Sequence, residues 1–237
     1  MKAPFGRIGG KSKICKKLVE LFPQMNTYNC YVELFFGAGS VFFRKPKIEG
    51  QLEVINDIDE EIYKIVDGLQ NKNKYINDNI NRDIIDKEYF HCLKKKDDVI
   101  SILEKIKWSF FAQGKTLSQG TGIKTNFSIY ETRLKDVIIF NKSFEIIIQE
   151  YDNPNTFFYL DPPYESKLKK DYKNYITPEQ IYNAIKNIKG KFLLSYNDSP
   201  NIRNLFQEYN INTITTNYIR TQNIKDRLKI ELYITNY

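Results

Sequence analysis

Residues 31–40 read YVELFFGAGS, an apolar run that ends in two glycines one residue apart. The run predicts a buried strand from Tyr31 to Phe35, because aromatic and β-branched residues favour strands. Glycines placed directly after a strand allow a tight turn whose backbone approaches a ligand closely. This stretch therefore predicts the first strand and the ligand-binding turn of an α/β sheet.

The sequence around this stretch alternates between helical and strand patterns. Residues 11–22 have the apolar spacing of an amphipathic helix, and a short helix is expected after the glycine turn. Residues 52–55 form a second predicted strand, which ends in Asn56 and Asp57. The helix expected beyond it carries one apolar stripe, made of Ile58, Ile62, Ile65, Val66 and Leu69. This alternation indicates a parallel sheet with helices on its faces.

The alternation stops between residues 71 and 135, where the chain is polar, mostly helical and then rich in Gly, Ser and Thr. We expect residues 1–60 and 136–237 to form one α/β domain, into which residues 61–135 are inserted as a helical region. The remaining predicted elements are strands at Val137–Phe140, Thr156–Leu160 and Phe192–Tyr196, a helix that opens at Thr177, and a closing β-hairpin of Asn212–Asn217 with Leu228–Thr235.

Composition narrows the function classes. The chain has 237 residues and a formal net charge of +7, which suits a polyanionic partner. Its start has no apolar signal segment and no run of about 18 apolar residues follows, so we expect an unexported protein without a membrane span. Three cysteines without metal-type spacing predict reduced thiols of a cytosol-like compartment. The one histidine, His91, argues against a histidine-built metal site and against a Ser-His-Asp triad.

Residues 160–164 read LDPPY and continue the predicted strand TFFYL. Two successive prolines fix the backbone and remove two N–H donors, so carbonyl oxygens there can accept other hydrogen bonds. Asp161 adds a carboxylate and Tyr164 an aromatic ring, at the edge where open α/β sheets bind ligands. An exocyclic amine needs this combination, because two acceptors take its hydrogens while a ring stacks on its base. The alternative, a proline-terminated strand with a capping Asp, is disfavoured by this placement.

Two further groups of residues suit an adenosine cofactor. Asp57, at the end of the second predicted strand, can accept hydrogen bonds from ribose hydroxyls, whereas Asp59 is better placed to cap the next helix. Phe42 stands where the dinucleotide fingerprint has its third glycine, so a nicotinamide enzyme fits poorly. Arg7 and Lys11 flank two glycines in RIGGK, a basic turn that could close over a carboxylate.

Together these motifs resemble the Dam-like family of DNA adenine-N6 methyltransferases. RIGGK at 7–11 is similar to the family's N-terminal element, and YVELFFGAGSVFF at 31–43 to its cofactor-binding segment. NDID at 56–59 matches the acid after the second strand, and DPPY at 161–164 matches the catalytic motif. Later family segments resemble LLSYND at 193–198 and KIELYITNY at 229–237. The resemblance implies a Rossmann-like methyltransferase fold with a mostly parallel sheet, a C-terminal β-hairpin and a helical insertion.

The resemblance also implies a cofactor and a role for each matching residue. S-adenosylmethionine would be the methyl donor, and no metal would be needed. Asp161 and the Pro162 carbonyl would bind the target amine, and Tyr164 would stack on an adenine flipped out of the duplex. The residues expected to hold the cofactor are Arg7, Lys11, Glu33, Gly37, Gly39, Asp57 and Asp161.

The predicted insertion is the candidate DNA-reading element. Residues 107–135 hold five Lys or Arg against one Glu, together with aromatic side chains; a solvated basic face is the alternative. Residues 113–130 do not match the recognition hairpin of GATC-modifying members, and Arg7 replaces an aromatic residue of those members, so GATC specificity does not follow. The expected DNA contacts are Lys107, Lys115, Lys124 and Arg133.

We therefore expect a site-specific methyltransferase that acts on adenine N6 in double-stranded DNA, in the DNA-containing cytoplasm of a bacterium or a virus-infected cell. A cognate restriction endonuclease would be its partner in a restriction–modification system; monomer and homodimer both remain open. Alternatives are methylation of cytosine N4, RNA or a protein amide, and a catalytically inactive DNA-binding relative. Intact Asp161 and Tyr164 disfavour the inactive relative, and the absence of a Pro-Cys motif excludes carbon-5 methylation.

Overall fold

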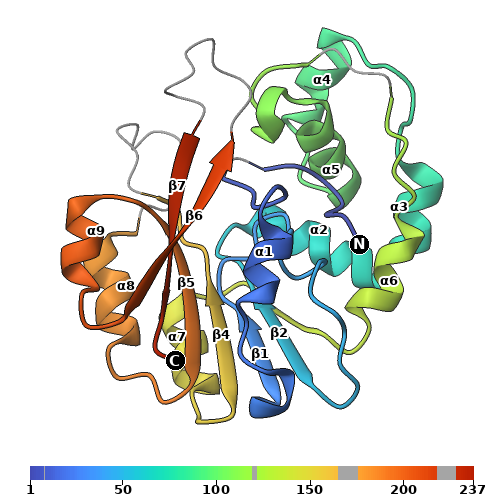
Figure 1. Ribbon diagram of the computed structural model, residues 1–237. Coiled ribbons are helices and arrows are strands. Elements are labelled where there is room, and N and C mark those ends of the chain that lie inside the picture. The colour runs from blue at the N-terminus through green and yellow to red at the C-terminus, as the bar shows by residue number, and fades with distance from the viewer. Residues whose placement is uncertain (8, 119–121, 165–175, 218–227) are drawn as a thin grey trace.

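The computed structural model describes residues 1–7, 9–118, 122–164, 176–217 and 228–237. Within these residues seven strands form one sheet in the order β3-β2-β1-β4-β5-β7-β6. The strands β1 to β5 pair in parallel, whereas β7 runs antiparallel to both β5 and β6 (Figure 1). This confirms the expected α/β fold with a mostly parallel sheet and an antiparallel C-terminal pair. The strands are β1 (Cys30–Glu33), β2 (Leu52–Asn56), β3 (Ile138–Phe140), β4 (Thr156–Leu160), β5 (Lys191–Asn197), β6 (Asn210–Asn217) and β7 (Leu228–Thr235).

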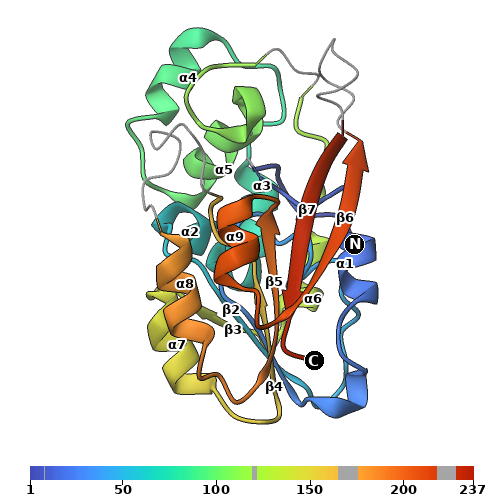
Figure 2. The same cartoon turned by 60° about the vertical axis from the view of Figure 1, so that its left-hand side comes forward.

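Helices cover both faces of the sheet. On one face lie α1 (Cys15–Glu20) and α2 (Glu60–Asn71), and on the other lie α7 (Phe144–Tyr151), α8 (Pro178–Ile185) and α9 (Pro200–Leu205). Figure 2 shows α1 and the pair α7 and α8 on opposite sides of the strands. Since neighbouring strand residues point to opposite faces, Tyr31 packs into one core and Val32 into the other.

The start of α8 follows the predicted pattern. The Thr177 hydroxyl accepts a hydrogen bond from the Gln180 N–H at 3.2 Å, and the Gln180 side chain accepts one from the Thr177 N–H at 2.9 Å. Pro178 occupies the first helical position, where no intrahelical N–H bond is lost. The sequence patterns did not predict α7 or α9. The run of isoleucines in α7, residues 146–148, has no clear helical period, and isoleucine favours strands.

The prediction of a short helix after the glycine turn is wrong. Residues 40–44 form turns instead, in which the Phe43 N–H donates to the Gly39 carbonyl at 2.9 Å and the Lys45 N–H donates to the Val41 carbonyl at 2.8 Å. Pro46 follows directly, and a residue before proline is disfavoured in the helical region, so the helical turn does not continue.

The helix after β2 also begins later than expected. Asp59 caps α2, so Ile58 precedes the helix and stays 41% exposed instead of joining the apolar stripe. The side chains of that stripe are otherwise buried, as predicted; they are Ile62, Ile65, Val66 and Leu69.

The region between α2 and β3 contains α3 (Asn73–Asn79), α4 (Lys87–Leu93), α5 (Val99–Trp108) and α6 (Ser128–Leu134). Although the sequence shows little apolar periodicity here, these helices bury apolar side chains in the same core as Tyr31 of β1. Helices of only two or three turns give too few positions for a clear periodic pattern. Their buried members are Ile76, Phe90, Leu93, Ile102, Leu103, Ile106, Trp108, Tyr130 and Leu134. Across the described part of the chain, no helix combines the length and apolarity that crossing a membrane requires.

Candidate active site

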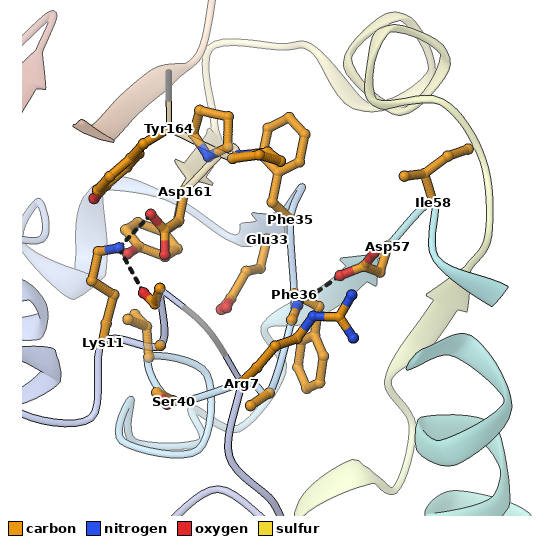
Figure 3. A pocket seen from close by; sticks show the side chains of 18 of the residues that line it. Arg7, Lys11, Glu33, Phe35, Phe36, Ser40, Asp57, Ile58, Asp161 and Tyr164 are labelled. Carbon is orange, nitrogen blue, oxygen red and sulfur yellow. Dashed lines mark hydrogen bonds and ion pairs between the residues drawn. The ribbon is translucent and has the colours of Figure 1, made fainter. Parts of the chain in front are cut away.

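The candidate site is a pocket at the carboxyl ends of three neighbouring strands. β1 pairs in parallel with both β2 and β4, so the acids at or just after their ends meet at one edge of the sheet. These acids are Glu33, Asp57 and Asp161, and all three line the pocket, which measures about 820 Å³ with its open mouth (Figure 3). The predicted residues that line it are Arg7, Lys11, Glu33, Gly37, Asp57, Asp161, Pro162 and Tyr164.

The two glycines after β1 have different functions. Gly37 lines the pocket, has a φ of 54° and donates its N–H to the Asp57 carboxylate at 2.7 Å. Gly39 has a φ of 71° but does not line the pocket. A Cβ at Gly39 would lie 2.3 Å from the ring of Phe36. Gly37 thus shapes the pocket surface, whereas Gly39 allows the aromatic packing behind it.

Of the two acids after β2, Asp57 lines the pocket and Asp59 caps α2, as the sequence suggests. Asp57 accepts hydrogen bonds from the N–H groups of Gly37 at 2.7 Å and Asp59 at 2.9 Å, and burial raises its pKa. Asp59 caps α2 through the Glu61 N–H at 3.0 Å, which confirms its expected capping role, and pairs with Arg7 at 2.5 Å. Asp59, in the loop after β2, therefore holds Arg7 at the pocket wall.

Asp161 and Lys11 form an ion pair inside the pocket. The Lys11 Nζ lies 2.6 Å from the Asp161 carboxylate and 3.1 Å from the Gly9 carbonyl, and Lys11 is only 4% exposed. Burial raises the pKa of Asp161, while the Lys11 charge opposes that rise. The ammonium therefore favours the ionised carboxylate, which is the form that accepts hydrogen bonds from an amine.

The Tyr164 side chain has contacts at its ring and at its hydroxyl. Its ring stacks on Tyr196 with a centroid distance of 5.3 Å, and the Lys11 Nζ lies 4.6 Å from its centroid. Its hydroxyl lies 3.1 Å from the Ser195 Oγ and donates to Glu231 at 3.2 Å. Ser195 and Glu231 were not singled out from the sequence as site residues, although they occur in the segments LLSYND and KIELYITNY that carry the family resemblance.

Glu33 lines the pocket but is only 2% exposed. It accepts a hydrogen bond from the Tyr31 hydroxyl at 2.6 Å, and burial raises its pKa to about 8. Phe35, Phe36 and Ile58 were not predicted as site residues, yet they supply apolar surface to the same pocket. Their place in the sequence near the sheet-edge acids Glu33 and Asp57 was the available signal.

Two of the four expected DNA contacts are on the surface and two are not. Lys115 and Lys124 are exposed. The Lys107 Nζ donates to the Pro4 carbonyl at 3.0 Å and to Thr125 at 2.7 Å, and burial lowers its pKa to about 8. It therefore ties the insertion to the N-terminal segment.

Arg133 is also a structural cation. It is 8% exposed and binds both carboxylate oxygens of Glu53 on β2 at 2.6 Å and 2.9 Å, and it donates to the Phe42 carbonyl at 3.2 Å. Because a side chain bound in this way is not available to a phosphate, the expectation of a DNA contact at Arg133 is corrected here, as it is at Lys107.

The pocket fits an adenosine-containing methyl donor. Gly37 presents its backbone, Asp57 a hydroxyl-binding carboxylate, and Phe35 and Ile58 apolar surface for a purine ring. The Asp-Pro-Pro-Tyr loop closes the same pocket from β4 with acceptors suited to an amine. This arrangement suits methyl transfer to an exocyclic amine.

Comparison with known proteins identifies the family. The model of D12 class N6 adenine-specific DNA methyltransferases matches residues 8–113 and 112–220, and the chain belongs to this family. It is a DNA adenine-N6 methyltransferase, and its family implies S-adenosylmethionine as methyl donor and DNA as substrate.

One relative with a known assignment agrees with this family. The chain is 25% identical over 229 residues to the type II methyltransferase M.CviBI of Paramecium bursaria Chlorella virus NC1A, and the match covers 85% of each protein. A solved structure, the putative methyltransferase yhhF from Escherichia coli, aligns with 9% identity and a TM-score of 0.41 over 99% of this chain and 90% of that one. The second likeness is too weak to support an inference.

Proposed function

We propose that this enzyme methylates adenine N6 at a specific site in double-stranded DNA, and that the pocket at the ends of β1, β2 and β4 is where the transfer occurs. The observation that carries the proposal is the ion pair at 2.6 Å between Lys11 of the N-terminal segment and Asp161, the first residue after β4. Burial raises the pKa of Asp161, and the Lys11 charge opposes that rise and so favours the ionised carboxylate at the point where an amine has to be bound.

The proposed cofactor site uses the residues on the β1 and β2 side of the pocket. Asp57 binds the ribose hydroxyls, and Arg7 and Lys11 face the methionine moiety. Glu33, Gly37 and Ala38 complete the wall. When bound, S-adenosylmethionine supplies a methyl group on a positively charged sulfur. The chain's own residues orient this group and exclude water from it.

The proposed target site uses the loop after β4. An adenine in duplex DNA is stacked and paired, so it has to be flipped out at a cost of a few kcal/mol. Asp161 and the Pro162 carbonyl each accept a hydrogen bond from the N6 amino group, which favours a pyramidal nitrogen whose lone pair points at the methyl group. Charge-assisted hydrogen bonds of this kind contribute roughly 1.5–3 kcal/mol each. Tyr164 stacks on the flipped base and holds its plane.

The proposed DNA-recognition region is the segment at 61–135, inserted into the catalytic domain of residues 1–60 and 136–237. Its helices α3, α5 and α6 contact α2, and α4 contacts α5, so the region lies beside the helical layer on one face of the sheet (Figure 1). We assign phosphate contacts to the exposed Lys115 and Lys124. Similarity to a type II methyltransferase supports a role in restriction and modification, with a cognate endonuclease as partner.

The methylated nucleoside in the product DNA shows which atom the enzyme modifies. Unmethylated DNA is incubated with the enzyme and S-adenosylmethionine, digested to nucleosides and weighed by mass spectrometry. We expect N6-methyladenine, formed on duplex DNA and confined to one sequence context. N4-methylcytosine, or methylation of RNA only, would contradict the proposal.

Asp161→Ala provides the matched test of the catalytic assignment. The variant should lose turnover while keeping cofactor affinity, because Asp161 is proposed to act on the target amine. If Asp161→Ala turned over like the wild type, the pocket would not be the site of transfer.

A further inference from the structure

Glu231 is a buried carboxylate that the proposed mechanism does not use. It lies on β7 opposite Asn197 of β5 and is 8% exposed. It is not among the residues that line the pocket but lies behind Tyr164. A buried charge is costly unless it is bound by partners, so the contacts of Glu231 indicate what it does.

The contacts of Glu231 converge on Tyr164. One carboxylate oxygen accepts the hydrogen bond from the Tyr164 hydroxyl at 3.2 Å, and the same oxygen lies 3.8 Å from the Lys11 Nζ. The Tyr164 hydroxyl also lies 3.1 Å from the Oγ of Ser195, which is 1% exposed on β5. The far end of the Tyr164 ring is therefore bound by side chains of two adjacent strands.

This arrangement restricts how the Tyr164 ring can turn. The ring contacts Tyr196 on one side, and its backbone follows two prolines with fixed φ. A hydrogen bond at the hydroxyl opposes rotation about the Cα–Cβ bond, which would swing the far end of the ring away from Ser195 and Glu231. Burial, together with the nearby carboxylates Asp161 and Glu231, raises the pKa of Tyr164 well above its usual value. The hydroxyl therefore stays protonated and remains a donor at neutral pH.

We infer that Glu231 is a positioning residue for methyl transfer, which holds the Tyr164 ring through its hydroxyl in the position at which the target adenine stacks. The inference rests on the proposed role of Tyr164 in base stacking. According to this inference, β7 contributes to catalysis through Tyr164, although no residue of β7 has to contact the DNA or the cofactor.

The test is a double-mutant cycle on the single-turnover rate, with cofactor and DNA saturating. We expect Glu231→Ala to slow transfer about five- to tenfold, the loss of one oriented hydrogen bond. Glu231→Gln keeps a carbonyl acceptor and should stay within about twofold of the wild type. In a Tyr164→Phe background Glu231→Ala should change the rate by less than about twofold, because the hydroxyl is already missing. Cofactor affinity should not change.

Thr235→Val is the control for general loosening of β7. Thr235 is buried on the same strand, and its hydroxyl donates to the Tyr237 carbonyl at 3.0 Å. Loss of this hydrogen bond should lower the melting temperature without slowing methyl transfer. Glu231→Met replaces Glu231→Ala in the cycle if the alanine variant does not fold.

Two outcomes would overturn the inference. One is an equal slowing by Glu231→Ala in the wild-type and Tyr164→Phe enzymes, which would place its action elsewhere, for example at Lys11. The other is an unchanged rate in Glu231→Ala. A wild-type enzyme that forms no N6-methyladenine would instead contradict the proposed function, so the two failures are distinguishable.

Discussion

At the scale of single residues, acids that look alike in the sequence differ in their surroundings. Asp57 and Asp59 are two positions apart, yet one faces the pocket and the other caps α2. Both Asp57 oxygens already accept backbone N–H groups, which aims the carboxylate and keeps it in place. Such fixed orientation is what a ribose-binding acid requires.

Asp57→Ala should weaken S-adenosylmethionine binding about 10- to 100-fold, since hydrogen bonds to a charged group contribute roughly 1.5–3 kcal/mol. Isothermal titration calorimetry measures this directly. Asp57→Asn, which keeps one acceptor oxygen, serves as the conservative control and should lose less. Unchanged affinity in the alanine variant would remove Asp57 from the ribose site.

Glu33 provides a pH-dependent prediction. Burial raises its pKa from 4.5 to about 8, so the folded protein keeps a proton that the unfolded chain releases. The free energy of unfolding should therefore fall as the pH rises from 4.5 to about 8. In Glu33→Gln this part of the fall should vanish. Thermal melts of both proteins without cofactor, between about pH 5 and 8, test the prediction, and parallel curves would disprove it.

At the scale of elements, the insertion contains two kinds of cation. Lys115 and Lys124 are exposed, whereas Lys107 is bound to the N-terminal segment. Lys115→Ala and Lys124→Ala should each weaken DNA binding and lower the slope of log K against log salt by about one. Cofactor affinity should be unchanged. Titrations of labelled DNA at several salt concentrations give the slope.

Lys107→Ala is the matched control for these two variants. It should lower the melting temperature, because its hydrogen bonds to Pro4 and Thr125 are lost, while the salt slope stays that of the wild type. If Lys115→Ala and Lys124→Ala bound DNA like the wild type, the insertion would be a structural element only.

At the scale of the whole molecule, the inserted helices and the sheet share one core. Arg133 of α6 strengthens this connection, because it binds Glu53 of β2 and the Phe42 carbonyl after the glycine turn. The guanidinium also lies 3.7 Å from the Phe42 ring centroid. The helices between α2 and β3 and the glycine turn after β1 thus pack into one core.

Arg133→Met should lower the free energy of unfolding by about 3 kcal/mol, since it removes one partner of a buried ion pair. Lys135→Met, an exposed position next to α6, should change it by less than about 0.5 kcal/mol. Calorimetry should show one cooperative transition in each protein. A separate early transition in Arg133→Met would mean that the insertion unfolds by itself.

The sequence alone determined the alternation of strands and helices, the glycine turn after β1 and the acids that end β2 and β4. Each of these features depends on residues that are close in the chain. The spacing of apolar residues, the glycines of a turn and the prolines all act over a few positions. Parallel pairing then brings the ends of β1, β2 and β4 to one edge, which is why the sequence could also predict most of the pocket.

Only the tertiary structure decided which charged residues face the surface and which bind within the protein. Arg133 and Lys107 resemble DNA contacts in the sequence, but their partners Glu53 and Pro4 come from distant segments. Glu231 likewise meets Tyr164 because β7 inserts next to β5, 67 positions away from that tyrosine in the chain. Pairing of this kind depends on how elements pack, and no local pattern of residues encodes it.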